Sequence, residues 1–317
     1  MEWYSFLPQD TLFFRGAEPA VMGENHTASV IFPPPAHTIQ GALRTAVLRE
    51  HNLHPADYNQ GNYAEDHPVI SAIGRSGEES PFQVVGPFFR WGERLWVPCP
   101  YHWFTEKEVF EKTEGIAALN VTVAEPITTP LISCKSGCTI YWSRGREMVT
   151  LGGSWVPLDE LHHSAITKII AKRSSFFGEE LHTGVALDVA TTRRGVREHH
   201  LYSFAHARLK GDVTLAFAVT RPLPLATSGV LTLGAEQRFG EYRKLEPIAL
   251  PQRESALFMT LSILPANAKT NDRCVATGHI VYYGGWDLHR RFHKPMKGYF
   301  PAGTVVDEQI NENCIPL

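Results

Sequence analysis

The segment Trp286 to Tyr299, WDLHRRFHKPMKGY, contains the strongest cluster of side chains that could do chemistry. His289 and His293 have the i, i+4 spacing that can hold zinc on a helix, but the surrounding cationic side chains would repel a divalent ion. Arginine and lysine bind phosphate oxygens, and interleaved aromatic rings can stack on bases. We interpret the segment as a candidate RNA-binding site, with a solvated basic loop as the alternative. The candidate residues are Trp286, His289, Arg290, Arg291, Lys294 and Lys297.

A second basic segment, TTRRGVREHHLYSF (191–204), follows a predicted strand that contains His182. A glycine among arginines is typical of a turn that presents backbone N–H groups and side chains to one anion. A charged hairpin tip is the alternative explanation. The candidate RNA-binding residues of this region are His182, Arg193, Arg194, Arg197, His199 and Tyr202.

A third candidate is the glycine-containing loop in LGAEQRFGEYRKLE (233–246). Small residues let backbone N–H groups approach a phosphate closely, and the segment also supplies donors and an aromatic ring. Its candidate residues are Gln237, Arg238 and Tyr242.

The fourth candidate joins the loop FFRGAEP (13–19) to the stretch VIFPPPAHTIQGALR (30–44). Gly41 lies in a predicted helix, where glycine costs about 1 kcal/mol relative to alanine. Either another backbone passes close to this first turn, or the glycine packs against a sheet without any ligand. The candidate residues are Arg15, His37, Gly41 and Arg44.

The sequence contains no phosphate-binding, zinc-protease, serine-hydrolase or dinucleotide-binding motif of high specificity. Cys134 and Cys138 are spaced C-x3-C without a second pair at zinc-finger distance, so we interpret them as a strand or turn pair, with a zinc site as the alternative. The absence of these motifs does not by itself exclude catalysis; we expect no metal and no cofactor.

Many short strands and few helices must position these candidates. Three prolines end an extended segment, and apolar residues at helical spacing predict an amphipathic helix from Thr38. We further predict a hairpin over 82–100, a short helix ended by Gly115, and a second helix opened by Pro157. The pattern is typical of an α+β fold with two units of similar size.

Charge is distributed unevenly along the 317 residues. Residues 1–150 contain 11 basic and 17 acidic side chains, whereas residues 151–317 contain 19 and 16. This asymmetry indicates an anionic partner for the second half. Five cysteines, an odd number, indicate a reducing compartment. The stretch MEWYSFLPQD (1–10) does not show a basic region followed by an apolar core, and the sequence has no uninterrupted apolar run of about 18 residues. We expect a soluble, cytoplasmic protein without a membrane partner.

Five segments in this order resemble the RAMP proteins of CRISPR effector complexes, and among them the Cmr-type (type III-B) subunit that caps the 5′ end of the guide RNA. The matching segments are PQDTLFFRGAEP (8–19), FPPPAHTIQGALRTAVL (32–48), HTGVALDVATTRRGVREHHLYS (182–203), LTLGAEQRFGEY (231–242) and GGWDL…KPM…PAGTV (284–305). The region 52–176 is only weakly matched. Ala235, where the family often has a second glycine, and VVDEQI after PAGTV depart from the pattern.

The resemblance implies two ferredoxin-like (RRM-like) domains, which we place at 1–175, with insertions, and at 176–317, with the glycine-rich and basic loops. It also implies a glycine-rich loop that faces RNA, no catalytic activity, and a role in antiviral defence. The expected partners are the 5′ tag of the crRNA, the large polymerase-like subunit and the backbone RAMP subunit.

Two rival functions stay open at this point. One is a RAMP-type, metal-independent endoribonuclease that processes precursor crRNA, with His37, His182 or His199 as general acid or base. The other is an assembly subunit that mainly binds protein, whose positive loops meet acidic partners.

Overall fold

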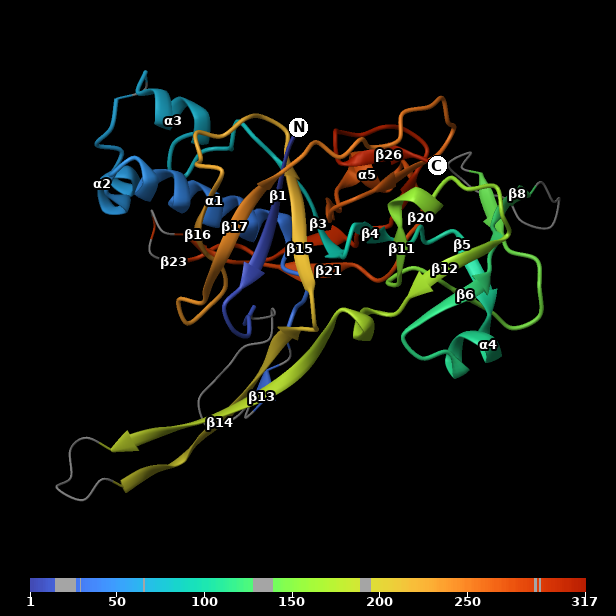
Figure 1. Cartoon of the computed structure of the whole chain (residues 1–317), viewed down its shortest axis with the longest axis horizontal. Helices are drawn as coiled ribbons and strands as arrows, with labels where there is room; N and C mark the ends of the chain where they lie inside the picture. The colour runs from blue at the N-terminus through green and yellow to red at the C-terminus, as the bar shows by residue number, and fades with distance from the viewer. Residues whose placement is uncertain are drawn as a thin grey trace.

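A nine-stranded antiparallel sheet forms the centre of the molecule (Figure 1). The computed structural model describes residues 1–14, 27–28, 30–64, 66–127, 139–188, 195–287, 290 and 292–317. In their order across the sheet, the strands are β16 (Ser228–Thr232), β17 (Phe239–Leu245), β1 (Glu2–Pro8), β15 (Val213–Val219), β3 (Val84–Trp91), β4 (Arg94–Pro98), β11 (Trp155–Pro157), β12 (Thr167–Ala171) and β6 (Ile116–Asn120).

The two faces of this sheet carry separate hydrophobic cores. Successive side chains of a strand point to opposite faces, and β1 shows this clearly. Tyr4 and Phe6 are fully buried in one core, whereas Trp3 is buried in the other with Phe88 and Met259. An aromatic strand at the N-terminus is therefore buried on both sides, which explains its central position.

Helix α1 (Ala36–Glu50) covers the first face, with Ile39, Leu43 and Val47 buried at helical spacing as predicted. Pro35 is its N-cap residue, so the proline run ends where the helix begins. Helices α2 (Pro55–Gln60) and α3 (Pro68–Ile73) pack beside it, each with a proline in its first turn. The remaining helices are α4 (Lys107–Lys112), α5 (Ala268–Asn271) and the 3-10 turns η1 (Leu158–Glu160) and η2 (Arg173–Ser175).

Smaller sheets surround this centre. Those of the middle region and the hairpin region are β10 (Met148–Thr150) with β5 (Trp103–Glu106) and β7 (Thr122–Val123), β8 (Glu125–Ile127) with β9 (Ile140–Trp142), and β13 (Phe177–Asp188) with β14 (Gly195–Leu209) and β2 (Thr27–Ala28). The described part of the C-terminal region has three sheets. The first contains β20 (Cys274–Ala276), β25 (Val305–Val306), β18 (Phe258–Thr260) and β26 (Cys314–Pro316), and the second contains β19 (Leu264–Pro265), β24 (Lys297–Phe300) and β21 (Val281–Tyr283). The third pairs β22 (Trp286–Asp287) with β23 (Phe292–His293).

Strands β13 and β14 form a long antiparallel hairpin that projects away from the rest of the molecule (Figure 1). They contain 12 and 15 residues. At about 3.4 Å per residue, the two strands extend over roughly 40 and 50 Å. Of the basic segment 191–204, residues 191–194 lie outside the described residues, and residues 195–204 belong to β14.

The predicted hairpin of β3 and β4 and the short helix α4 before Gly115 are confirmed. The second helix, expected after Pro157, is wrong. A single 3-10 turn follows Pro157, and Thr167–Ala171 is a strand between β11 and β6. The β-branched Ile169 and Ile170 fit a pleated surface, and pairing on both sides outweighs the helical spacing of the segment.

The α+β class is confirmed, whereas the two ferredoxin-like domains stay a prediction. Strand β15, from the second half, lies between β1 and β3 from the first. The sheet is thus one hydrogen-bonded unit that spans the predicted boundary at 175/176, and a division of the chain there does not coincide with a break in it.

Candidate nucleic-acid interface

The first turn of α1 meets the β21–β24 region, and we call the group formed by His37, Tyr283, Lys294, Lys297 and Tyr299 the histidine–tyrosine site. The three ring centroids lie close together: His37 is 5.8 Å from Tyr283 and 5.9 Å from Tyr299, and the tyrosines are 5.8 Å apart. The charge of Lys294 acts on His37, and Lys297 lies opposite Tyr283 in the pairing of β21 with β24. The structure thus joins segments about 250 residues apart in the sequence.

The helix end at this site suits an anion. Pro35 makes no side-chain capping hydrogen bond, and no acidic residue lies in the first turn of α1. The N-terminus of a 15-residue helix carries a partial positive charge, because its first N–H groups lack partners within the helix. The lysines add full charges beside it, and the backbone N–H of Lys294 donates to the carbonyl of Gly285 at 2.8 Å, which holds the turn.

His37 is neutral at pH 7. Desolvation of the ring between the tyrosines, and then the positive charge of Lys294, lower its pKa to about 4, although the residue as a whole is exposed. A neutral imidazole donates and accepts hydrogen bonds without repelling a neighbouring cation. The site thus combines a ring surface, a neutral hydrogen-bonding group and two cations, which is the chemistry that binds phosphate and stacks on bases.

Gly41 lies one turn further along α1, on the exposed side of the helix. A Cβ added there would meet no described atom within 4 Å, so packing of this glycine against the sheet is excluded as its explanation. The approach of another backbone to this turn stays a prediction.

Arg44 is turned toward its own chain. Its Nε donates to the carbonyl of Ile73 at 2.8 Å, and Nη2 lies 3.5 Å from the carbonyl of Glu78. The guanidinium therefore ties α1 to the end of α3, and its predicted contact with RNA is not tested.

A second group, which includes the predicted His182 and Arg238, lies at the base of the long hairpin, in a closed series of charged and polar contacts that we call the charge ring. Its members are Asp10, Glu180, His182, His206, Arg208, Glu236 and Arg238. They come from the N-terminal loop, both hairpin strands and the glycine-containing loop. Four segments distant in sequence are therefore joined at one place.

The arginines bridge the acidic members of the charge ring. Arg208 contacts Glu180 at 2.6 Å and Asp10 at 3.0 Å, and Arg238 contacts Asp10 at 2.8 Å and Glu236 at 3.1 Å. Hydrogen bonds from Arg208, and then from His182, lower the pKa of Glu180 to about 2. The backbone N–H of Thr11, followed by Arg208, lowers the pKa of Asp10.

Two stacked histidines complete the charge ring by connecting Glu180 to Glu236. His182, 2.9 Å from Glu180, lies parallel to the buried His206 with centroids 4.0 Å apart. His206 Nδ1 is 3.1 Å from the hydroxyl of Thr11, and Nε2 is 3.9 Å from Glu236. Burial, and then the proximity of His182, lower the pKa of His206, since two cations in parallel contact repel each other.

The glycines of the third candidate segment have an explanation within the chain. A Cβ at Gly234 would lie 2.9 Å from the carbonyl oxygen of Phe13, and one at Gly240 only 2.3 Å from that of Leu7. Gly234 also has a φ of 100°, which disfavours other residues. Both glycines therefore allow this loop to lie against the N-terminal strand and loop. Gln237 is exposed in the same loop, with a φ of 55°.

Tyr242, a candidate RNA-binding residue, is not accessible to a base. Its ring is fully buried beneath α1, and its hydroxyl donates to the carboxylate of Glu50. Burial, and then this hydrogen bond, raise the pKa of Tyr242. The residue belongs to the core because β17 alternates, and Tyr242 points to the face that α1 covers.

Several candidates cannot be placed at the level of side chains. Arg15, Arg193, Arg194, His289 and Arg291 lie outside the described residues, and so do Cys134 and Cys138. For Arg197, His199, Tyr202 and Trp286 only the strand position is described. Arg290 is exposed.

Sequence reasoning missed Tyr283, which adjoins the pair Gly284–Gly285, and it missed His206, Arg208 and the acidic members of the charge ring. The repeated tyrosines of HIVYYGGWDL were a usable signal. In the part of the chain that the structure describes, no three His, Cys, Asp or Glu side chains converge on a metal site, and no helix is long and apolar enough to cross a membrane.

Comparisons with known proteins support the fold. The family model described as CRISPR-associated protein (Cas_Cmr3) matches residues 4–307. Among solved structures, the chain is similar to one from the Type III-B Cmr-beta complex bound to cognate target RNA, at 14% identity and a TM-score of 0.58, covering 97% of this chain and 87% of that one. The chain is also similar to one from that complex bound to cognate target RNA and AMPPnP, at 14% identity and a TM-score of 0.57, covering 96% of this chain and 85% of that one. No curated protein matches the chain.

Proposed function

Because the chain belongs to the Cas_Cmr3 family of CRISPR-associated proteins, as a Cmr-type subunit, we propose that it binds the 5′ tag of the crRNA in a type III effector complex. The observation that carries the proposal is the histidine–tyrosine site. There an uncapped helix N-terminus, two lysines and three rings lie together. In this role the protein is non-catalytic and links the large polymerase-like subunit to the backbone subunit.

Two further observations support RNA as the partner. The solved structures that share the fold come from complexes bound to target RNA. Phe292 and Tyr282, near the site on β23 and β21, leave 68% and 58% of their surface accessible, and exposed rings are suitable platforms for unstacked bases.

The test is a salt titration of binding to a fluorescent RNA that carries the repeat-derived tag. Lys294→Ala/Lys297→Ala removes two phosphate contacts, and each contact contributes about 0.7 to the slope of log K against log salt for a single strand. We expect the slope to fall by about 1.4. Lys112→Ala/Lys269→Ala, which removes two exposed lysines elsewhere, is the matched control. An unchanged slope in the first variant contradicts the proposal.

The endoribonuclease alternative finds no support at His37, because a histidine with a pKa of about 4 is a weak general base at neutral pH. Incubation of the protein with repeat RNA in EDTA distinguishes the two functions. We expect intact RNA. Cleavage that is lost in His37→Ala or His182→Ala would make the protein a nuclease.

A further inference from the structure

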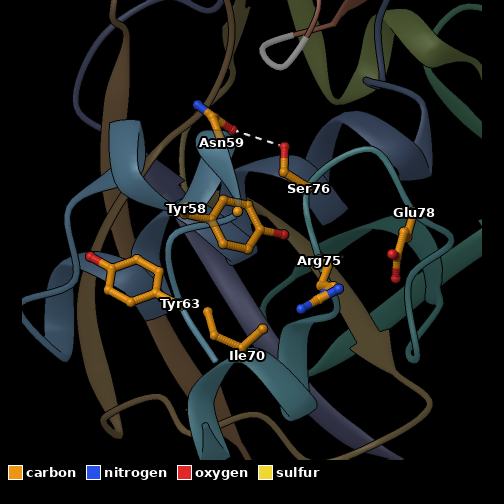
Figure 2. Close-up of a pocket in the computed structure, with 8 residues that line it drawn as sticks. Tyr58, Asn59, Tyr63, Ile70, Arg75, Ser76 and Glu78 are labelled. Atoms are coloured by element: carbon orange, nitrogen blue, oxygen red, sulfur yellow. Dashed lines mark hydrogen bonds between the residues drawn. The ribbon is translucent and has the colours of Figure 1, made fainter. Parts of the chain in front are cut away.

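A small pocket lies in the helical segment that follows α1, away from the histidine–tyrosine site. It is lined by Tyr58, Asn59, Gly61, Tyr63, Ile70, Arg75, Ser76 and Glu78, from α2, α3 and the loops after them (Figure 2). Its volume is about 130 Å³. Pockets for drug-sized ligands measure roughly 300–1,000 Å³, so this one accepts a single side chain or base.

The walls of the pocket are held in place by their own hydrogen bonds. Tyr58 donates its hydroxyl proton to the carbonyl of Gly74 at 2.8 Å, and Ser76 donates to Asn59 Oδ1 at 3.0 Å (Figure 2). The hydroxyl oxygen of Tyr63 accepts the N–H of His54 at 2.7 Å. A preformed pocket loses little conformational entropy when it binds, which favours its use as a recognition site.

These bonds also decide which occupant the pocket suits. Reading a base edge requires polar groups directed at the ligand. Here the hydroxyl groups of Tyr58, Tyr63 and Ser76 are engaged with the protein. The space is lined by the rings of Tyr58 and Tyr63 beside the buried Ile70, and by the polar or charged side chains of Asn59, Arg75, Ser76 and Glu78 (Figure 2). An aromatic ring can pack against the tyrosines and receive a guanidinium on its face.

The surroundings of the pocket are acidic. Among the described residues of 55–80, four side chains are acidic, Asp57, Asp66, Glu78 and Glu79, and one is basic, Arg75. Arg44 of α1 adds a second cation, with its Nη2 3.5 Å from the carbonyl oxygen of Glu78. Glu78 and Glu79 are exposed. Such a rim repels the phosphates of RNA and attracts positive charge. An aromatic anchor in a central pocket with a charged rim is the common arrangement of a protein–protein interface.

We propose that this pocket binds an aromatic side chain of a protein partner, from a segment in which basic residues flank the aromatic one. The ring fills the space between Tyr58, Tyr63 and Ile70, and the flanking cations pair with Glu78 and Glu79. The contact therefore joins this subunit to protein, at a surface separate from the one proposed for RNA.

The experiment uses the full chain assembled with the other protein subunits of its effector complex and with guide RNA. p-Azidophenylalanine replaces Tyr63, which keeps the ring and places a photoreactive group at the pocket. We expect irradiation to give an adduct with a protein subunit, mapped by mass spectrometry to an aromatic residue flanked by Lys or Arg. An adduct with RNA, or no protein adduct, overturns the proposal.

Charge reversal at the rim gives a second readout. Glu78→Lys/Glu79→Lys, added to the photoreactive chain, is expected to lower the adduct yield at least fivefold. Glu93→Lys/Glu114→Lys makes the same charge change at exposed residues elsewhere and leaves the yield within twofold. Equal yields for the two variants overturn the proposal. Binding of tag RNA to the unassembled chain is measured in parallel, so failure at the pocket is distinguished from failure of the RNA site.

Discussion

The histidine–tyrosine site and the pocket of α2 and α3 are both built around two tyrosines beside α1, but they differ in charge. At the start of α1, Lys294 and Lys297 stand beside the rings, and no acidic residue lies in the first turn of the helix. Beyond its end, the pocket has an acidic rim. The two proposals therefore differ through charge and not through ring surface: the lysines favour the phosphates of RNA, and the acidic rim favours a protein segment with basic residues.

Removing the floor of the pocket should give the largest effect. Ile70 is 3% exposed, and a buried Ile→Ala change costs about 2–5 kcal/mol of unfolding free energy. We expect Ile70→Ala to lose this amount in urea denaturation followed by tryptophan fluorescence, while the folded protein binds tag RNA within twofold of the wild type. Ile280→Ala, at a residue 43% exposed, is the control. A loss of RNA affinity in folded Ile70→Ala would show that the two sites are not independent.

Charge reversal at the basic site should have the next largest effect. Lys294→Glu/Lys297→Glu is expected to weaken binding of tag RNA more than tenfold, which corresponds to about 1.4 kcal/mol. Glu78→Lys/Glu79→Lys should leave this affinity within twofold. Fluorescence anisotropy at one fixed salt concentration measures both. Equal effects of the two double variants would contradict the division of partners by charge.

The pH dependence of the basic site should be weak above pH 5.5. Because His37 has a pKa of about 4, it stays neutral there, and RNA affinity should not rise as the pH falls from 8 to 5.5. NMR titration of the imidazole should give the midpoint near 4, and Lys294→Gln should raise it. The folded pKa lies below the unfolded value of about 6.5. The unfolded chain therefore takes up the proton first, and this contribution to stability is lost as the pH falls from 6.5 toward 4. A midpoint above 6 would contradict the packing of the three rings.

The smallest effect is expected for Tyr63→Phe. The change removes the oxygen that accepts the His54 N–H but keeps the ring, so unfolding free energy should fall by about 0.5–1.5 kcal/mol. Tyr282→Phe, at a ring 58% exposed, is the control and should be neutral. Thermal denaturation measures both. A larger loss than that of Ile70→Ala would mean that the hydrogen bond, and not the floor, holds the pocket together.

Local patterns of the sequence predicted helix α1 and the β3–β4 hairpin, because apolar spacing and turn residues act over a few positions. The strand at Thr167–Ala171 escaped prediction because its neighbours β11 and β6 come from other parts of the chain. Tyr242 was misassigned for a related reason. Only the pairing of β17 with β1 and β16, under α1, shows which face its ring takes.

The sequence was sufficient to predict which residue types form the candidate site, but not which of these residues lie next to one another. The basic segment and His37 were identified from composition, but their contact depends on a fold that joins residues about 250 positions apart. The pocket of α2 and α3 lies in the region whose resemblance to the family is weakest. Its tyrosines have no distinctive spacing, and only the packed helices bring them together.

The charge ring fixes the base of the long hairpin to the rest of the molecule. Its ion pairs hold both hairpin strands to the N-terminal loop and the glycine-containing loop at one point. From Glu180 to Asp188 and from His206 to Gly195 the strands extend roughly 27 and 37 Å, so a rotation of a few degrees at the base moves these outer ends by roughly 1–3 Å. A small shift of Asp10 between Arg208 and Arg238 therefore produces a larger displacement at the outer end of the hairpin.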